Sequence, residues 1–458
     1  MSTLLLSGCT SWEVTGKVVK KGEPVSGENL FLPTYFAATA GLKFAKAFSG
    51  PMSCHSVCIT EEGKCYAFGR NQAGQLGVGD LGNRANPTLI KGLEHLNIVK
   101  AACGKTHTLF LSSGGEVWVC GSNKFGELGI GKTSDQEEKP KAITSTLGNK
   151  VVDIGAGVEF SMIVTEEGRV LSFGHPEYGA LGHGTDGKYI ISTGREGFRE
   201  MPTPTQIPTW HTSDIKGKDY LGGAVDAPKI KRVFCGNKHT LCLDEEGCLW
   251  SWGYNGYGRL GLNDPHDRKR PCKVDFFTGP HAIKNFDLVA AGGATSGAVD
   301  GIGQLYTWGQ IKKVGESQVR PWICQDLSGW RIRSMSFGNE SFAIAADSNK
   351  EPRRPWIEGC ESVPHVITWG GGKYGELGYG PGKKSSANPD IVASLTETVV
   401  QAVQAGYGHT LYLLGPDADA EKFPTYDPPE DKPVSASAGK KRGASGDAKG
   451  APAKKKKK

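Results

Sequence analysis

Short runs of apolar residues recur along most of this chain, and each run ends in a turn. Residues 235–262 show the unit: 239–243 alternates as a strand with one buried face does, and 244–247 supplies turn residues. Residues 248–253 form a second predicted strand with large apolar side chains, and a glycine-rich loop follows. Few windows have the period of an amphipathic helix, so the pattern predicts an all-β protein built from repeated hairpins.

The hairpin unit recurs at a spacing that indicates a repeat architecture. The second strand of each unit closes on a glycine, and successive closing glycines lie 52, 53, 79, 56 and 61 residues apart. These glycines are Gly69, Gly121, Gly174, Gly253, Gly309 and Gly370. A Gly-x-Leu-Gly loop follows most of them, and a period near 50 residues is typical of a propeller or a solenoid.

The two ends of the chain complement each other. Residues 406–413 have the pattern of a first strand with no second strand after it, and residues 4–8 have that of a second strand with no first. Together they make a seventh unit, which predicts a seven-bladed β-propeller with a composite blade closed by the N-terminal strand. We assign residues 1–415 to this propeller and residues 416–458, rich in Pro, Ser and Lys, to a disordered basic tail.

Three units depart from the repeat. One insertion lies between Gly187 and Pro228, a second spans residues 349–365, and the fifth unit lacks the Gly-x-Leu-Gly loop after Gly309, so we expect a notch there. Long insertions in a regular repeat are either functional loops or disordered. As candidate partner-binding residues we select charged and aromatic side chains in and beside the two insertions: Asp186, Lys188, Arg195, Arg199, Trp210, Arg353 and Arg354.

Composition adds a charged tail to this picture. The formal net charge is +6, but residues 432–458 contain ten Lys or Arg and one Asp, which leaves the rest of the chain slightly acidic. The tail's basic clusters are Lys440, Lys441, Arg442, Lys454, Lys455, Lys456, Lys457 and Lys458. They predict a nuclear address or an electrostatic contact to nucleic acid or another polyanion, and a merely solubilising tail remains the alternative.

Several other function classes find no support in the sequence. No apolar run is long enough for a membrane span, and the 12 cysteines show no Cys-x-x-Cys, which favours buried free thiols in a reducing compartment. We expect a monomer that does not bind a membrane. Residues 126–133 match the phosphate-loop pattern, but acidic residues and a proline follow where a helix is needed. We therefore expect no cofactor and no nucleotide site, and the absence of a catalytic constellation argues against an enzyme.

Histidine recurs at one position of the repeat. His107, His239 and His409 share this position, with His55 near it. One histidine in each blade cannot converge on one metal ion, which needs three or four ligands together. We expect no metal site, and we expect each ring to hydrogen-bond within its own blade.

These features resemble a known family over residues 4 to about 414. The repeated Gly-x-x-His-Thr, the Trp-Gly or Phe-Gly strand ends and the Gly-Gln-Leu-Gly loop at 74–77 are similar to the regulator-of-chromosome-condensation repeat. Residues 176–188 and 329–334 resemble the telophase-disk branch of that family. The resemblance implies a seven-bladed propeller with one composite blade.

The resemblance also implies a function. It suggests a small-GTPase regulator, either a guanine-nucleotide exchange factor or a GTPase-binding protein, acting in chromosome segregation or cytoskeletal control. One hypothesis is that the loop 184–200 wedges against the GTPase's phosphate-binding region, where Asp186 competes for its lysine or Mg²⁺. The alternative is a non-catalytic scaffold that links protein partners to chromatin or microtubules through the basic tail. Both imply a nuclear and cytoplasmic protein that associates with chromosomes or the spindle.

Overall fold

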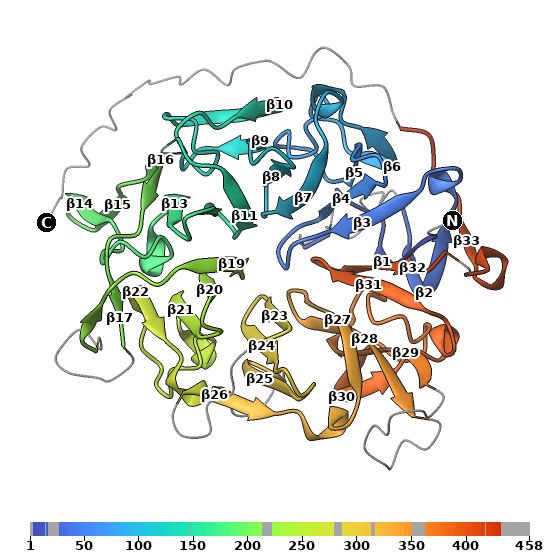
Figure 1. The fold of residues 1–458 in the computed structure, drawn as a ribbon. Coiled ribbons are helices and arrows are strands. Elements are labelled where there is room, and N and C mark those ends of the chain that lie inside the picture. The colour runs from blue at the N-terminus through green and yellow to red at the C-terminus, as the bar shows by residue number, and fades with distance from the viewer. Residues whose placement is uncertain are drawn as a thin grey trace, which may run out of the picture.

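Seven β-sheets stand around a central axis (Figure 1), which confirms the predicted seven-bladed propeller. The computed structural model describes residues 3–13, 15–16, 27–146, 148–212, 222–278, 286–312, 317–349, 362–416 and 418–431. The innermost strands of all seven blades line a central cavity of about 230 Å³. Within the described ranges, no helix has the length and apolar character needed to cross a bilayer.

Each blade has four antiparallel strands, which we name from the axis to the rim. Blades 1 and 2 contain β3 (Phe44–Phe48), β4 (His55–Thr60), β5 (Cys65–Gly69), β6 (Arg84–Leu89), and β7 (Ile98–Cys103), β8 (His107–Ser112), β9 (Val117–Asn123), β10 (Ser134–Ala142). Blades 3 and 4 contain β11 (Val151–Ala156), β12 (Phe160–Thr165), β13 (Val170–Gly174), β16 (Met201–Gln206), and β19 (Ile230–Cys235), β20 (His239–Asp244), β21 (Leu249–Gly253), β22 (Arg268–Lys273).

The remaining three blades follow the same plan. Blades 5 and 6 contain β23 (Leu288–Ala291), β24 (Thr295–Val299), β25 (Leu305–Gly309), β26 (Gln318–Ile323), and β27 (Arg331–Phe337), β28 (Ser341–Asn349), β29 (Ser362–Gly371), β30 (Ser385–Ile391). Blade 7 contains β31 (Val400–Ala405), β32 (His409–Leu414), β1 (Leu4–Cys9) and β2 (Asn29–Phe36). The expected composite blade is confirmed, because β1 pairs antiparallel with β32 from Leu4↔Leu413 to Gly8↔His409.

Short elements decorate this frame. β14 (Lys188–Ser192) and β15 (Arg195–Phe198) form a separate hairpin, β17 (Trp210–His211) and β18 (Ala224–Val225) extend blade 4, and β33 (Thr425–Tyr426) extends blade 7. The 3₁₀ turns are η1 (Ala37–Thr39), η2 (Lys91–Leu93), η3 (Glu177–Gly179), η4 (Gly256–Gly258), η5 (Asp275–Phe277), η6 (Gln325–Leu327), η7 (Ala393–Leu395) and η8 (Ala420–Lys422).

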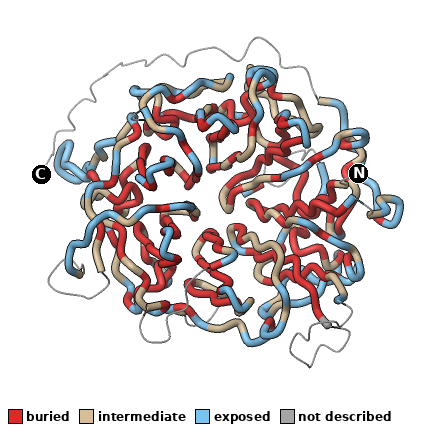
Figure 2. The backbone as a smooth tube through the Cα atoms, in the orientation of Figure 1, coloured by how far each residue is buried: buried red, intermediate tan, exposed pale blue. Residues whose placement is uncertain are grey.

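The hydrophobic core is divided among the junctions between blades. Each of seven apolar clusters combines side chains of two neighbouring blades. Both faces of a blade are therefore covered, and middle strands such as β8 and β12 are buried at every position. Figure 2 shows this buried backbone inside the blades and the exposed backbone at the rim.

The Gly-x-Leu-Gly loops, which we call tongues, connect the third and fourth strands of a blade. In blade 4 the Asn255 side chain organises the tongue: its Oδ1 accepts from Leu260 N at 2.9 Å and its Nδ2 donates to Asp264 O at 2.7 Å. Asn71 and Asn123 do the same in blades 1 and 2. The asparagine is thus a local signal for the loop's conformation.

The buried histidines bind across blades, so the expectation that each bonds within its own blade is wrong. His107 Nε2 lies 3.0 Å from Ser161 Oγ of blade 3, and His239 Nε2 lies 3.0 Å from Ser296 Oγ of blade 5. The rings point sideways because the blades pack face to face, so the nearest polar group belongs to the next sheet.

The tail begins later than the predicted boundary at residue 416. Residues 418–431 lie against the propeller: Phe423 and Tyr426 are buried, and β33 pairs with β2. Asp431 Oδ1 accepts from Ala85 N of blade 1 at 2.6 Å. Two aromatic side chains bury enough apolar surface to order this segment despite its polar composition. The basic residues at 432–458 lie outside the described residues.

Candidate partner-binding surface

The long third-unit insertion projects a hairpin from the rim of blade 3. β14 and β15 pair with each other, from Lys188↔Phe198 to Ser192↔Arg195, and join no blade sheet. On β14 three consecutive apolar residues face solvent: Tyr189 is 43% exposed, Ile190 81% and Ile191 49%. An apolar patch on a rigid scaffold is typical of a protein-binding surface.

The neighbouring blade fixes the base of this hairpin. Gly184 N donates to Lys269 O of β22 at 2.7 Å, and Lys269 Nζ pairs with Asp186 Oδ2 at 3.0 Å. Partial burial raises the pKa of Asp186, but the Lys269 hydrogen bond and further donors outweigh it and hold this pKa below its ordinary value. Asp186 therefore remains ionised at neutral pH and anchors the hairpin.

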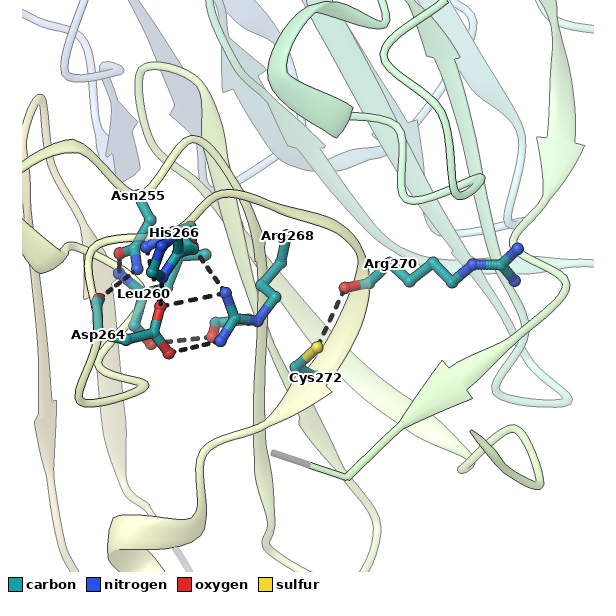
Figure 3. A network of polar contacts seen from close by, with 8 residues as sticks. Asn255, Leu260, Asp264, His266, Arg268, Arg270 and Cys272 are labelled. Carbon is teal, nitrogen blue, oxygen red and sulfur yellow. Dashed lines mark hydrogen bonds and ion pairs between the residues drawn. The ribbon is translucent and has the colours of Figure 1, made fainter. Parts of the chain in front are cut away.

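Blade 4 presents Lys269 on a rigid strand. The adjacent Arg268 is buried and forms an ion pair with Asp264, which also accepts from His266 N at 2.8 Å (Figure 3). Arg270 extends away from this network in the same view. A paired and hydrogen-bonded buried charge fixes local geometry, so the network holds β22 and the support of the hairpin in place.

An aromatic and basic ridge continues from the foot of the hairpin toward blade 4. The Phe198 and His175 ring centroids lie 4.6 Å apart. Tyr178 and Tyr254 pack at 4.5 Å, and Lys238 Nζ lies 4.8 Å over the Tyr178 ring. Aromatic rings with adjacent cations are suited to a protein partner that offers both apolar and acidic groups.

The structure separates the selected insertion residues. Lys188 pairs with Glu196 at 3.2 Å on the hairpin, and Arg195 and Arg199 are exposed at its tip and exit. Trp210 is 2% exposed and packs against Trp250 at 5.2 Å, so its side chain stabilises a blade junction and offers no surface contact. Arg353 and Arg354 lie outside the described residues.

Sequence reasoning missed the exposed apolar run on β14 and the residues of blade 4 that support the hairpin. The run Tyr189, Ile190 and Ile191 was a usable signal, because three adjacent apolar residues inside a polar insertion have no core to enter. Lys269 and Lys238 gave no signal, since they belong to regular blade positions and reach Asp186 and Tyr178 only because the blades pack side by side. Within the described part of the chain, no group of histidine, cysteine and acidic side chains has the arrangement of a metal site.

The phosphate-loop match at 126–133 is a tongue. A Cβ placed at Gly126 would lie 2.5 Å from Pro202 Cα of blade 3, and the strand β10 begins at Ser134 where a nucleotide-binding loop requires a helix. The glycines therefore serve close packing between blades.

The fold agrees with the comparisons. The family model of the RCC1-like domain matches residues 25–412, so the chain belongs to the RCC1-like propeller family. Within that family it is 37% identical over 438 residues to Protein RCC2 of Homo sapiens, covering 93% of this chain and 79% of the relative. The similarity to the telophase-disk branch is thereby confirmed.

More distant relatives share the propeller. The chain is 30% identical over 365 residues to the ultraviolet-B receptor UVR8 of Arabidopsis thaliana, covering 78% of this chain and 72% of the relative. Among solved structures, human WBSCR16 aligns with a TM-score of 0.68 at 18% identity, covering 91% of this chain and all of that one. Prp20p from Saccharomyces cerevisiae aligns with a TM-score of 0.65 at 20% identity, covering 92% and 93%. These structures support the fold alone.

Proposed function

We propose that this protein regulates a small GTPase, as an exchange factor or a GTPase-binding protein, through the β14–β15 hairpin and the adjacent ridge. The observation that carries the proposal is the exposed apolar run of β14, Tyr189 to Ile191, on a hairpin anchored to two blades. Further support comes from the structurally similar Prp20p, whose structure was described together with its binding to Gsp1p and histones. We place the activity in chromosome segregation or cytoskeletal control, in the nucleus and cytoplasm.

Exchange requires differential binding and no bond chemistry. A regulator that binds the nucleotide-free GTPase more tightly than the loaded form weakens nucleotide affinity by the same factor. The hairpin suits this role because contacts with blade 4 hold its base while β14 presents exposed apolar side chains, so inserting the hairpin displaces GTPase segments without deforming the propeller. Asp186 is paired with Lys269, so we assign it to positioning the hairpin and assign the contact to Tyr189, Ile190 and Ile191.

The test measures release of a fluorescent guanine nucleotide from Ran-, Rac-, Ral- and Arf-type GTPases, together with pull-down of their nucleotide-free forms. We expect one GTPase to bind and Ile190→Asp to weaken that binding by roughly 10- to 100-fold, since a buried apolar contact is lost. Ile302→Asp is the matched control, because Ile302 is 90% exposed on the turn between β24 and β25. Equal effects of both variants, or no binding to any of the four, would refute the proposal.

A second candidate function is a scaffold whose tail holds chromatin or microtubules. The supporting observation is the position where the tail starts: Asn86 Nδ2 donates to Pro429 O at 3.0 Å, which fixes the chain at the rim of blade 1 just before its ten basic residues. Deleting residues 432–458 tests this role. Chromosome or spindle association that survives the deletion would exclude the tail as the anchor, and tail-dependent binding should weaken steeply with salt.

A further inference from the structure

The tongues fill the junctions between blades, and all of them use the same buried side chain. Each tongue inserts a leucine against the following blade, and these leucines are at most 1% exposed: Leu76, Leu128, Leu181, Leu260 and Leu377. Trp12 fills the junction between blades 7 and 1, where it packs on Phe68 at 6.2 Å. Six of the seven junctions are therefore filled by a side chain from the preceding blade.

The following blade recognises the tongue backbone through polar groups. Ser296 Oγ and Trp308 Nε1 of blade 5 donate to Arg259 O at 2.8 and 2.9 Å. Thr108 Oγ1 donates to Gln75 O at 2.7 Å, and Ser161 Oγ donates to Glu127 O at 2.8 Å. The carbonyl that accepts always precedes the inserted leucine.

The first glycine of the tongue sits on the outer strand of the following blade. A Cβ at Gly258 would lie 2.5 Å from Val319 Cα, and a Cβ at Gly179 would lie 2.4 Å from Lys269 Cα. Both partners directly follow the residue that pairs with the closing glycine of their own blade. A tongue that enters a junction therefore carries glycine at this point and an apolar side chain two residues later.

The junction between blades 5 and 6 has no such filling among the described residues. The segment after Gly309 contains neither the organising asparagine nor a Gly-x-Leu-Gly sequence, and the apolar cluster at this junction includes no residue from it. A cavity of about 300 Å³ lies there instead. Its walls include Thr295 and Ile311 of blade 5 and Phe342, Gly370, Ser386 and Ala387 of blade 6.

Blade 6 presents an apolar version of the tongue-binding surface. Phe342 occupies the position that Ser or Thr holds in the other blades, such as Ser296, and its ring stacks on Trp369 with centroids 4.8 Å apart and planes 8° apart. Ala387, the counterpart of Val319, is exposed, and none of the glycines that the structure describes lies against it as Gly258 lies against Val319. The surface thus keeps the shape of a tongue site but replaces its hydroxyl by an aromatic wall.

We propose that this cavity, the blade 5–6 pocket, binds a glycine-flanked leucine turn of a protein partner, in the way that five other junctions bind a tongue of this chain. The occupant follows from the molecule itself: five of its own loops show which sequence fits such a junction. Phe342 offers an apolar contact to the partner's leucine where the other blades offer a hydroxyl. The pocket is separate from the hairpin on blade 3 and does not depend on the proposed GTPase function.

The experiment uses a tongue of this chain as the probe. A fluorescein-labelled peptide with the sequence of residues 255–263, NGYGRLGLN, is titrated with the full chain and followed by anisotropy. We expect saturable binding, and we expect a peptide with Leu260→Asp to bind roughly 10- to 100-fold more weakly because its leucine can no longer be buried.

Variants of the full chain locate the binding. Ala387→Trp places a large ring over the pocket and should weaken the peptide at least 10-fold, whereas Ala393→Trp, at another exposed alanine of blade 6, should leave it unchanged. Circular dichroism confirms that both variants fold. No saturable binding, or equal binding to both variants, would overturn the proposal. Binding only after Val314→Asp would overturn it too, because the chain's own segment would then be the occupant.

Discussion

Single histidines connect neighbouring blades, and their burial makes the molecule sensitive to acid. Burial lowers the pKa of His55 to about 3 and the pKa values of His107 and His409 to about 4, from an ordinary value of 6.5. Each ring is therefore neutral in the folded protein at pH 5 but protonated in the unfolded chain. The stability that these residues contribute is complete above about pH 6.5 and is lost as pH falls toward the folded pKa values.

This loss of stability in acid leads to a residue-scale prediction for His107→Phe, which introduces the residue found at the equivalent position of blade 3, Phe160. The variant loses the hydrogen bond to Ser161 Oγ and should be less stable at pH 7.5. Between pH 6 and 5, however, the variant should lose less unfolding free energy than the native protein, and the difference should be about 1.4 kcal/mol per pH unit. Urea unfolding midpoints at the three pH values check this, and parallel losses in both proteins would contradict it.

At the scale of the element, the tongue is a loop whose conformation is fixed by its own hydrogen bonds and by its contact with the next blade. Asn255 is fully buried and forms hydrogen bonds to both sides of its loop. The packing of Leu260 against blade 5 depends on that loop conformation. The hairpin β14–β15 is the opposite kind of element, because it projects from the ring and pairs with no blade sheet. Loops that pack between blades and a loop that projects from them thus arise at the same edge of a blade.

The element-scale prediction concerns Asn255→Ala. Removing the amide leaves the Leu260 N–H and the Asp264 carbonyl without their partner in a buried loop, which should cost about 1–3 kcal/mol of unfolding free energy. Asn388→Ala, at an exposed position of β30, should change it by less than about 0.5 kcal/mol. Chemical denaturation of both variants provides the comparison, and indistinguishable midpoints would show that the amide does not hold the tongue.

At the scale of the whole molecule, closure depends on both ends of the chain. β1 completes blade 7, and the segment 418–431 then runs over β2 to the rim of blade 1. Each junction buries side chains from two blades, so an opening at one junction exposes apolar surface on both sides. The C-terminal segment therefore stabilises blade 7, in which the two ends of the chain pair with each other.

Truncation tests this role of the C-terminal segment. Ending the chain after Gly415 removes the buried Phe423 and Tyr426, which should cost roughly 3–6 kcal/mol and lower the thermal midpoint by several degrees. Ending it after Asp431 removes only the basic tail and should leave the midpoint unchanged. Differential scanning calorimetry of the two truncations distinguishes them, and equal midpoints would mean that residues 416–431 contribute nothing to closure.

The sequence by itself determined the repeat, the number of blades and the joining of the two ends. These follow from local signals: turn residues, strand alternation, closing glycines at regular spacing, and two incomplete units that fit each other. It also located the insertion that forms the hairpin and the unit that lacks a tongue, because both are interruptions of a regular pattern.

Only the tertiary structure decided what these features contact. Trp210 is core and Ile190 is surface, although both belong to one insertion, because the ring buries the first between blades and projects the second beyond them. The histidines bond to the next blade, Lys269 reaches Asp186, and Ala387 borders a cavity for the same reason. Contacts between blades join residues far apart in the chain, and closure of the ring sets them, so no local pattern encodes them.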